Sequence, residues 1–526
     1  MTNKNKIFNT LLVVIAVILL NMASLYVFTR FDFTEDQVFS ISDASKDVLA
    51  QLDDRIIVKA YFSKELPAPF SSVSRYVRDI LEEYKAYSKG NFYFEFISPG
   101  DDKSLEEEAM NFRVPPQQVQ VLENDKFEIK KVFMGLVFLY QDKKEVMPLI
   151  RKTDGLEYDI TSAIKKLTEM DRKTVGIVQG HGEPSLLEEL KNLKAILEKQ
   201  YNVIPVQLSA EPAVSADVDA LLLISPQDSL SGEDLFKLDQ FIMRGGKAAF
   251  LLNEHTVNIE TAMATPLNLG LSPFLENYGI KINNDIVMDA QCSAISVGQQ
   301  QGYFQIVNQV NYPFFPIVNQ FNENLILVKD LEQVYHFFAS SIDTSFAGKA
   351  GVKVEFLAKS SDKSGKQVGR FMVNPMQKYN AESFNESGLI LSAAYFGNFK
   401  SYFSADDIPE GFDKNLYLSQ ADSNRILVVG EGNFVKDDYL SSAPDNVILI
   451  SNMVDYLVQD EALISIRSRG VTSRPLKQIE SQSAKAVIKW VNILVPPLLI
   501  VIVGLGLFYY RKNKRQKLII EILNSN

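Results

Sequence analysis

Two long apolar segments near the ends of the chain limit what it can fold into. Residues 7–28, "IFNTLLVVIAVILLNMASLYVF", and residues 490–510, "WVNILVPPLLIVIVGLGLFYY", contain no charged side chain. A stretch of about 20 apolar residues is long enough to cross the hydrocarbon core of a bilayer. The sequence therefore predicts a membrane-anchored protein with two transmembrane helices, at residues 7–28 and 487–510.

The first segment has an alternative interpretation as a cleaved signal peptide, in which Lys4 and Lys6 would form the basic region. The apolar stretch is long for a signal peptide, and no small-residue cleavage site follows it. Both features favour a transmembrane helix.

The second segment carries residues typical of membrane helices. Trp490 lies at one end, where aromatic side chains favour the membrane interface. Pro496 and Pro497 are tolerated inside a bilayer and predict a kink. Gly504 and Gly506 would permit close packing of another helix, or would equally well face lipid. These five residues are the candidates for packing against a membrane partner.

Charged flanks predict the topology. The second segment is followed by a basic run, and residues 1–6 are also basic, whereas "RFDFTED" after the first segment is net acidic. The positive-inside rule places both termini in the cytoplasm of a bacterial inner membrane and the main body, about residues 29–486, outside. The residues that fix this topology are Arg511, Lys512, Lys514, Arg515 and Lys517. A net charge of −11 disfavours nucleic acid as a partner.

The outer region predicts two α/β domains. Residues 29–172 give a β-α-β unit, then four strands and a helix at about 156–170, an order similar to a thioredoxin-like layout. No C-x-x-C motif is present, which excludes that redox chemistry. Residues 173–460 alternate strands with helices, including one expected at 185–200, and predict a doubly wound sheet.

Two further segments complete this organisation. Residues from about 290 to 405 are rich in Gln, Asn, Ser, Phe and Tyr, and we expect a β-rich insertion there. Residues 461–486 are expected to form an extended arm leading to the second membrane helix, and residues 511–526 a basic cytoplasmic tail.

The stretch "TVGIVQGHGEPSLLEEL", residues 174–190, is the main candidate site. Gly180 and Gly182 permit a positive φ and a close backbone approach. His181 can exchange a proton near neutral pH, and Glu183 supplies a carboxylate. Free N–H groups at a helix start after Pro184 would cradle an anion. The turn is therefore a structural turn, a ligand-contacting loop or a catalytic loop, and the first interpretation is favoured.

His255 follows another strand end and would share a crevice with His181, although a surface loop position is the simpler expectation. The motifs of several enzyme classes are missing: the chain has no G-x-S-x-G, no G-x-x-x-x-G-K-[ST] and no H-E-x-x-H. Its one cysteine, Cys292, excludes an intrachain disulfide and a multi-cysteine zinc site. We therefore predict no catalytic residue, no metal and no cofactor.

Several segments in order resemble one family. They are "FDFTEDQVFSISDASKDVLAQL", "VGIVQGHGEP", "FIMRGGKAAFLL", "VVGEGNFVKDD", "NMVDYL" and "LISIRSR" before the terminal apolar segment. Together they are similar to the gliding-motility-associated ABC transporter auxiliary family of the GldG type. The resemblance implies a glutamine-amidotransferase-like α/β unit without the catalytic cysteine. It also implies a subunit that works beside a separate permease and a separate ATP-binding protein.

The leading hypothesis is a non-enzymatic subunit of an ABC transporter that binds a solute, an envelope polymer or another protein. The alternatives are an envelope hydrolase or amidase that uses the His181/Glu183 loop, and a purely structural envelope scaffold.

Overall fold

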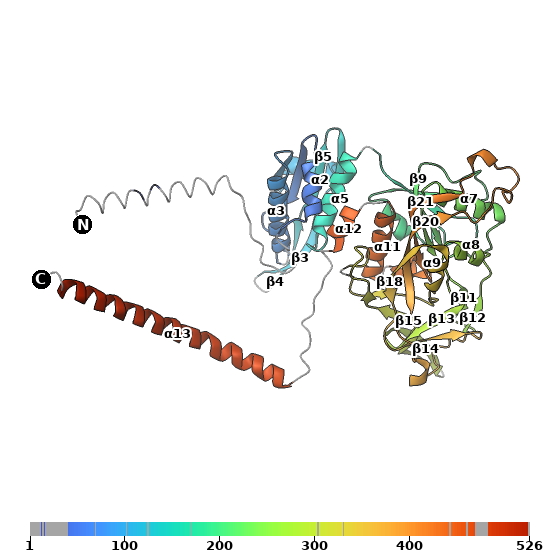
Figure 1. Ribbon diagram of the computed structural model, residues 1–526. Coiled ribbons are helices and arrows are strands. Elements are labelled where there is room, and N and C mark those ends of the chain that lie inside the picture. Colours follow the sequence, from blue (N-terminus) through green and yellow to red (C-terminus); the bar gives the residue numbers. More distant parts are fainter. Residues whose placement is uncertain are drawn as a thin grey trace. The chain divides into compact units, whose positions relative to one another are not determined.

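The computed structural model describes most of the chain (Figure 1). The described residues are 12, 15, 40–68, 70–100, 102–123, 126–169, 171–301, 304–329, 331–440, 443–458, 461–468 and 482–523. The predicted first membrane helix, residues 7–28, thus lies outside the described residues except at Leu12 and Ile15. The chain divides into two units, Met1–Thr472 and Ser473–Asn526, which are described separately below.

The first part of the larger unit is built on a four-stranded sheet with the order β2-β1-β5-β6. β1 and β2 are parallel, whereas β5 is antiparallel to both β1 and β6. The elements in chain order are α2 (Asp43–Ala50), β1 (Ile56–Phe62), α3 (Phe70–Tyr87), β2 (Phe92–Ile97), α4 (Lys103–Asn111), the β3 (Gln117–Glu123) and β4 (Lys126–Val132) hairpin, β5 (Met134–Tyr140), β6 (Lys143–Met147) and α5 (Leu156–Thr168).

Alternation along β1 explains how this sheet is covered. Ile56 and Val58 are fully buried and pack with the apolar faces of α3 and α5. Tyr61 points to the other face and packs with Ala109 of α4. Successive side chains of a strand point to opposite faces, so helices on both sides are needed to bury them. The β-α-β unit, the four strands and the last helix of this region lie close to where the sequence predicts them, whereas α2 was not predicted. The thioredoxin-like comparison stays a prediction.

The second part is built on an eight-stranded sheet with the order β16-β18-β20-β21-β10-β9-β7-β8. The five strands from β21 to β8 are parallel to one another. β20, β18 and β16 continue the sheet in antiparallel pairs. The strands are β7 (Thr174–Val178), β8 (Asn202–Val206), β9 (Val218–Ile224), β10 (Lys247–Leu251), β16 (Gln320–Phe321), β18 (Lys353–Lys359), β20 (Ile390–Lys400) and β21 (Gln420–Val429).

Helices cover both faces of the parallel strands (Figure 1). α6 (Lys191–Leu197) and α11 (Pro444–Leu457) pack on one face, and α7 (Gly232–Met243) and α8 (Ser272–Asn277) pack on the other. This explains why "DALLLIS" is apolar throughout, since Leu221 and Leu222 face opposite cores and are both buried. The whole region is mixed α/β with several sheets.

The segment 290–405 is rich in strands, but part of it extends the main sheet. β16, β18 and β20 add three strands to the main sheet beyond β21, and α9 (Ser345–Ala350) precedes β18 in the chain. The other strands of this segment, and those shortly before it, form smaller sheets: β11 (His255–Asn258) with β12 (Met263–Pro266), β13 (Asp285–Asp289) with β19 (Ser364–Val368), and β14 (Cys292–Gln301) with β15 (Phe304–Val318) and β17 (Val334–Tyr335).

The expected extended arm at 461–486 is wrong at its beginning, because Glu461–Ser468 is helix α12. Leu463 and Ile464 of α12 are fully buried, and the helix packs against α2, α5 and α11. Arg467 forms a 2.8 Å ion pair with Asp455 of α11 and donates to the Tyr158 hydroxyl of α5 at 2.6 Å. Apolar burial and this ion pair hold the segment as a helix.

The smaller unit contains α13 (Gln482–Leu523), which runs without interruption past Pro496 and Pro497. Within it, Lys489–Gln516 is long and apolar enough to cross a membrane, with a mean hydropathy of 2.5 and no buried side chain. The described residues contain this one candidate span. It agrees with the second predicted membrane helix, whereas the first is not tested, and the predicted kink stays a prediction.

The Arg467 ion pair gives a prediction about stability. Arg467→Met leaves the Asp455 carboxylate, 1% exposed, without its cation. Removing one partner of a buried pair costs about 3–5 kcal/mol. We expect a loss of that size in the free energy of unfolding, measured by denaturant titration of a version that ends before α13.

Lys194→Met is the matched control, because Lys194 pairs with Glu198 at the surface and should contribute below about 1 kcal/mol. The double variant Arg467→Met/Asp455→Leu should recover most of the loss. Equal midpoints for Arg467→Met and Lys194→Met would contradict the assignment.

Candidate functional site

The candidate site is formed by the loops that follow four parallel strands of the main sheet. These loops, here called the strand-end loops, are residues 179–185, 225–231, 252–255 and 430–434, after β7, β9, β10 and β21. Because the strands are parallel, their carboxyl ends meet at one edge of the sheet, where open α/β sheets commonly bind ligands.

The Gly-His-Gly turn is pinned to the loop after β9. Gly180 and Gly182 have φ values of 119° and 76°, in the region that favours glycine. The His181 carbonyl oxygen accepts hydrogen bonds from the backbone N–H groups of Gln227 (2.8 Å) and Asp228 (2.9 Å). A Cβ atom on Gly182 would lie 2.9 Å from the Gln227 Cβ. The two glycines are therefore explained by the shape of the turn.

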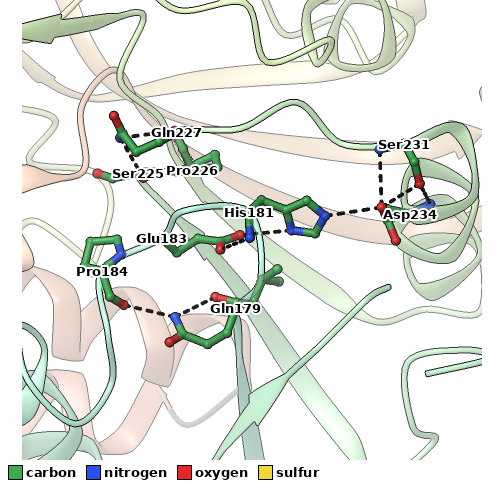
Figure 2. A network of polar contacts seen from close by, with 10 residues as sticks. Gln179, His181, Glu183, Pro184, Ser225, Pro226, Gln227, Ser231 and Asp234 are labelled. Atoms are coloured by element: carbon green, nitrogen blue, oxygen red, sulfur yellow. Dashed lines mark hydrogen bonds and ion pairs between the residues drawn. The ribbon is translucent and has the colours of Figure 1, made fainter. Parts of the chain in front are cut away.

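His181 lies between two carboxylates (Figure 2). Its Nε2 is 3.2 Å from Asp234 Oδ2, and its Nδ1 is 3.3 Å from Glu183 Oε1. The second Glu183 oxygen accepts the His181 backbone N–H at 2.6 Å. The side chains of His181, Glu183 and Asp234 are 7%, 0% and 6% exposed. The imidazole is therefore enclosed by protein.

Asp234 is the partner of His181 that the sequence analysis did not identify. It occupies the N3 position of α7 in a capping box with Ser231, whose hydroxyl donates to Asp234 Oδ2 at 2.6 Å. Burial alone would raise the pKa of Asp234, but the hydrogen bonds from Ser231 and His181 lower it overall. The sequence "SGED", residues 231–234, is typical of a capped helix start, but it carries no sign of a contact with His181.

This arrangement lacks the hydrogen bond of nucleophilic catalysis. A nucleophilic hydroxyl must donate to the base that activates it. The Ser231 hydroxyl, which belongs to the same group of contacts, donates to Asp234 instead. Among the described residues, the side-chain partners of His181 are Asp234 and Glu183. The geometry fits a loop that is fixed in place by charge and hydrogen bonding.

The expected anion cradle after Pro184 is wrong, because no helix starts there. Residues 185–190 form turns, and α6 begins at Lys191. The Ser185 N–H donates to the Glu189 carboxylate at 3.2 Å, and the Leu186 N–H donates to the Gln179 side-chain oxygen at 3.4 Å. The first N–H groups of α6 itself are capped by Asp437, at 3.2 and 2.9 Å. The backbone donors are thus satisfied within the chain.

His255 is buried, so its expected surface position is wrong. It begins β11, is 4% exposed, and its ring centroid lies 4.0 Å from that of Phe371. Burial lowers its pKa to about 4, with a smaller opposing effect from Asn284. It does not contact His181; the two loops are connected by Gln227, which accepts from the Thr256 hydroxyl at 3.1 Å.

A second polar cluster joins the remaining strand-end loops. Asn253 donates to Ser225 Oγ (3.3 Å) and Asn433 Oδ1 (3.2 Å) and accepts from the Gly432 N–H (2.8 Å). Glu431 accepts the Asn433 N–H at 2.5 Å, and its other oxygen lies 3.3 Å from Nδ1 of His336.

The sequence analysis did not identify this second cluster, because its members come from segments far apart in the chain. Its carboxylate–imidazole pair, Glu431 and His336, is fully buried.

A small cavity lies near these loops. It has a volume of about 80 Å³, lies beside the end of β10 and is lined by Glu254 and residues 267–273, among others. A larger one of about 470 Å³ lies elsewhere, over β6 and α5, and is lined by Tyr158, Ser162 and Lys199 among others. Among the described residues, no group of three or more His, Cys, Asp or Glu side chains is placed to hold a metal ion.

The fold and the enclosed strand-end loops define a mixed α/β domain. Residues 172–458 match the family described as "ABC-type uncharacterized transport system", which covers more than half of the chain. The chain therefore belongs to this ABC transport-system auxiliary family and has a transport-associated role. Residues 35–139 match a family described as a domain of unknown function.

Individual relatives extend the comparison. A protein of Borreliella burgdorferi, described as uncharacterized, is 26% identical over 530 residues, with 98% of this chain and 100% of that protein covered. The solved mmIFT52 N-terminal domain is 12% identical with a TM-score of 0.35, covering 54% of this chain and 97% of that one. A ThuA-like protein from Parabacteroides merdae is 10% identical with a TM-score of 0.26, covering 58% and 94%. The two structural similarities are too low to carry an argument.

Asp234 gives the first prediction about the site. Asp234→Ala removes the N3 carboxylate of the capping box of α7, which costs up to about 1 kcal/mol, and leaves the buried Nε2 of His181 without a partner, which costs about 1–3 kcal/mol more. We expect the sum of these losses in the free energy of unfolding.

Glu233→Ala is the control for this variant. Glu233 is an exposed neighbour in the same helical turn and should change the free energy of unfolding by less than about 0.5 kcal/mol. If the two variants were equally stable, Asp234 would not hold the loop.

Glu254 gives a prediction about pH. Burial raises its pKa from 4.5 to about 7, Lys281 lowers it and Asp285 raises it further. Between pH 4.5 and about pH 7 the unfolded chain has already lost a proton that the folded chain keeps. The contribution of Glu254 to the free energy of unfolding therefore falls as the pH rises through this range. Glu254→Gln should therefore gain stability relative to the wild type between pH 5 and pH 8, measured as the difference in melting temperature.

Glu260→Gln, at an exposed position, should show a constant difference from the wild type across the same pH range. A constant difference for Glu254→Gln as well would contradict the raised pKa.

Proposed function

We propose that this protein is a non-enzymatic, membrane-anchored accessory subunit of an ABC transport system linked to gliding motility. Residues 29–486 lie outside the bacterial inner membrane, and both termini lie in the cytoplasm. A separate permease and a separate ATP-binding protein complete the system. Membership of the ABC transport-system auxiliary family supports this assignment, and the ordered segments similar to the GldG type support its link to gliding.

Enclosure of the strand-end loops is the observation that carries the non-enzymatic role. The side chains where an α/β enzyme would hold its reactive groups are buried in protein. His181 lies between the Asp234 and Glu183 carboxylates. Asn253 binds the loops after β9 and β21, and Glu431 binds the backbone of its own loop. Reactive groups enclosed by the fold in this way are not exposed to a substrate.

The anchor is supported by α13. Its span Lys489–Gln516 is exposed along its length, and such an apolar surface requires lipid or another membrane helix. Trp490, Pro496, Pro497, Gly504 and Gly506 are the residues we assign to packing against the permease. The basic residues that follow lie on the last turns of the same helix and favour a cytoplasmic end.

The outer region binds a solute, an envelope polymer or a partner protein. Of the residues proposed at the ligand loop, Gly182 is exposed, whereas His181 and His255 are buried and would act by holding the loop's shape. The cavity of about 470 Å³ over α5 is within the size range of small-molecule sites and provides a second place for a solute.

The test is purification of the full-length tagged protein from its own membranes in mild detergent, with partners identified by mass spectrometry. We expect a permease and an ATP-binding protein to co-purify with the wild type and with His181→Gln. The variant Gly504→Leu/Gly506→Leu should recover at least tenfold less permease. Val501→Leu/Val503→Leu, on the same span, is the matched control and should retain it.

Recovery of neither partner from the wild type would contradict the accessory role. Hydrolysis of muropeptides or glycans by the purified protein that is lost in His181→Gln would contradict the non-enzymatic role.

A further inference from the structure

The β14–β15 hairpin belongs to the longest uncharged stretch of the outer region. No Asp, Glu, Lys or Arg occurs from Ala290 to Asn322, although 23% of the chain is charged. The stretch is rich in Gln and Asn. A polar segment of this length without any charge is unusual on a surface of net negative charge, and the proposed transport role does not account for it.

The hairpin is a two-stranded ribbon over most of its length. β14 pairs with β15 from Ala294↔Asn311 to Gln301↔Phe304. Within the described part of the chain, the only further strand is β17, which pairs with β15 at Ile317 and Val318. The outer edge of β14 therefore has no neighbouring strand there. The part of the hairpin beyond β17 has two strands, and a further strand paired with β14 would stabilise it.

Exposure along the hairpin agrees with an open surface. Ala294, Ser296 and Gly298 are exposed, and Val307, opposite Gly298, is 61% exposed. Proteins usually protect such an edge with lysine, proline or a covering segment. β14 carries neither lysine nor proline. The edge is therefore open to pairing with an additional strand.

We propose that the edge of β14 pairs with the β14 edge of a second copy of this chain. The charge distribution favours this occupant: two copies, each of net charge −11, repel one another over acidic surfaces, and the uncharged hairpin lets them approach without that repulsion. Two identical edges related by a two-fold axis pair antiparallel. The dimer then contains a continuous four-stranded sheet made of two hairpins.

Variants that place lysines on the edge strand β14 test the contact. The full-length protein in detergent is measured by light scattering, with Ala294→Lys/Ser296→Lys compared with the control Lys353→Ala/Lys366→Ala, which alters charge on other strands. We expect the wild type and the control to be dimers and the double-lysine variant to be a monomer with an unchanged melting temperature. A monomeric wild type at all concentrations, or a dimer that survives both lysines, overturns the proposal.

Single cysteines locate the contact directly. In a Cys292→Ser background, cysteines at Ala294, Ser296 and Gly298 are oxidised in turn in native membranes. A two-fold axis predicts that the positions cross-link to differing extents, with the strongest disulfide dimer nearest the axis. Cross-linking of these positions to a different protein in place of a second copy overturns the proposal.

Discussion

The enclosure of His181 between Asp234 and Glu183 is the interaction on which the strand-end region depends. The buried imidazole forms a hydrogen bond with Asp234 through Nε2 at 3.2 Å, and its Nδ1 lies 3.3 Å from a Glu183 oxygen without a hydrogen bond. Asp234 belongs to the start of α7 and His181 to the end of β7, so the contact fixes a helix against a strand end. The backbone of the same turn is bonded to the loop after β9.

Buried polar contacts also connect other loops and helices of the larger unit. Glu431 and His336 form a second buried carboxylate–imidazole pair, and Asn253 joins three loops through its amide. At the end of the outer region, Arg467 connects α12 to α5 and α11. The last helix before the segment leading to α13 is thus bound to α2 and α5 of the first part and to α11 of the second.

Much of the fold was predictable from the sequence because periodicity reports burial. The apolar run of β9 and the spacing of Val73 and Val77 in α3 predicted elements that the structure contains. Local patterns failed where distant side chains decide the outcome. Glu189 and Gln179 take the N–H groups that a helix after Pro184 would have offered, and α12 is helical because it is buried against elements far away in sequence.

The position of the candidate site was predictable from the sequence, but the burial and the contacts of its histidines were not. The motif around His181 correctly indicated a tight turn at a strand end, since glycines with positive φ are recognisable locally. Two contacts could not be predicted, because they join segments that are distant in sequence. His181 binds Asp234, 53 residues away, and His255 packs against Phe371. The sequence therefore suggested accessible histidines where the structure has enclosed ones.

The central claim is that the histidines of this protein are structural, and chemical modification tests it most directly. All three, His181, His255 and His336, are buried. Folded protein is treated with diethylpyrocarbonate and the modified peptides are counted by mass spectrometry against a denatured sample. The account predicts that the three histidines stay unmodified until the protein unfolds. Modification of His181 in the folded protein as fast as in the denatured one would contradict it.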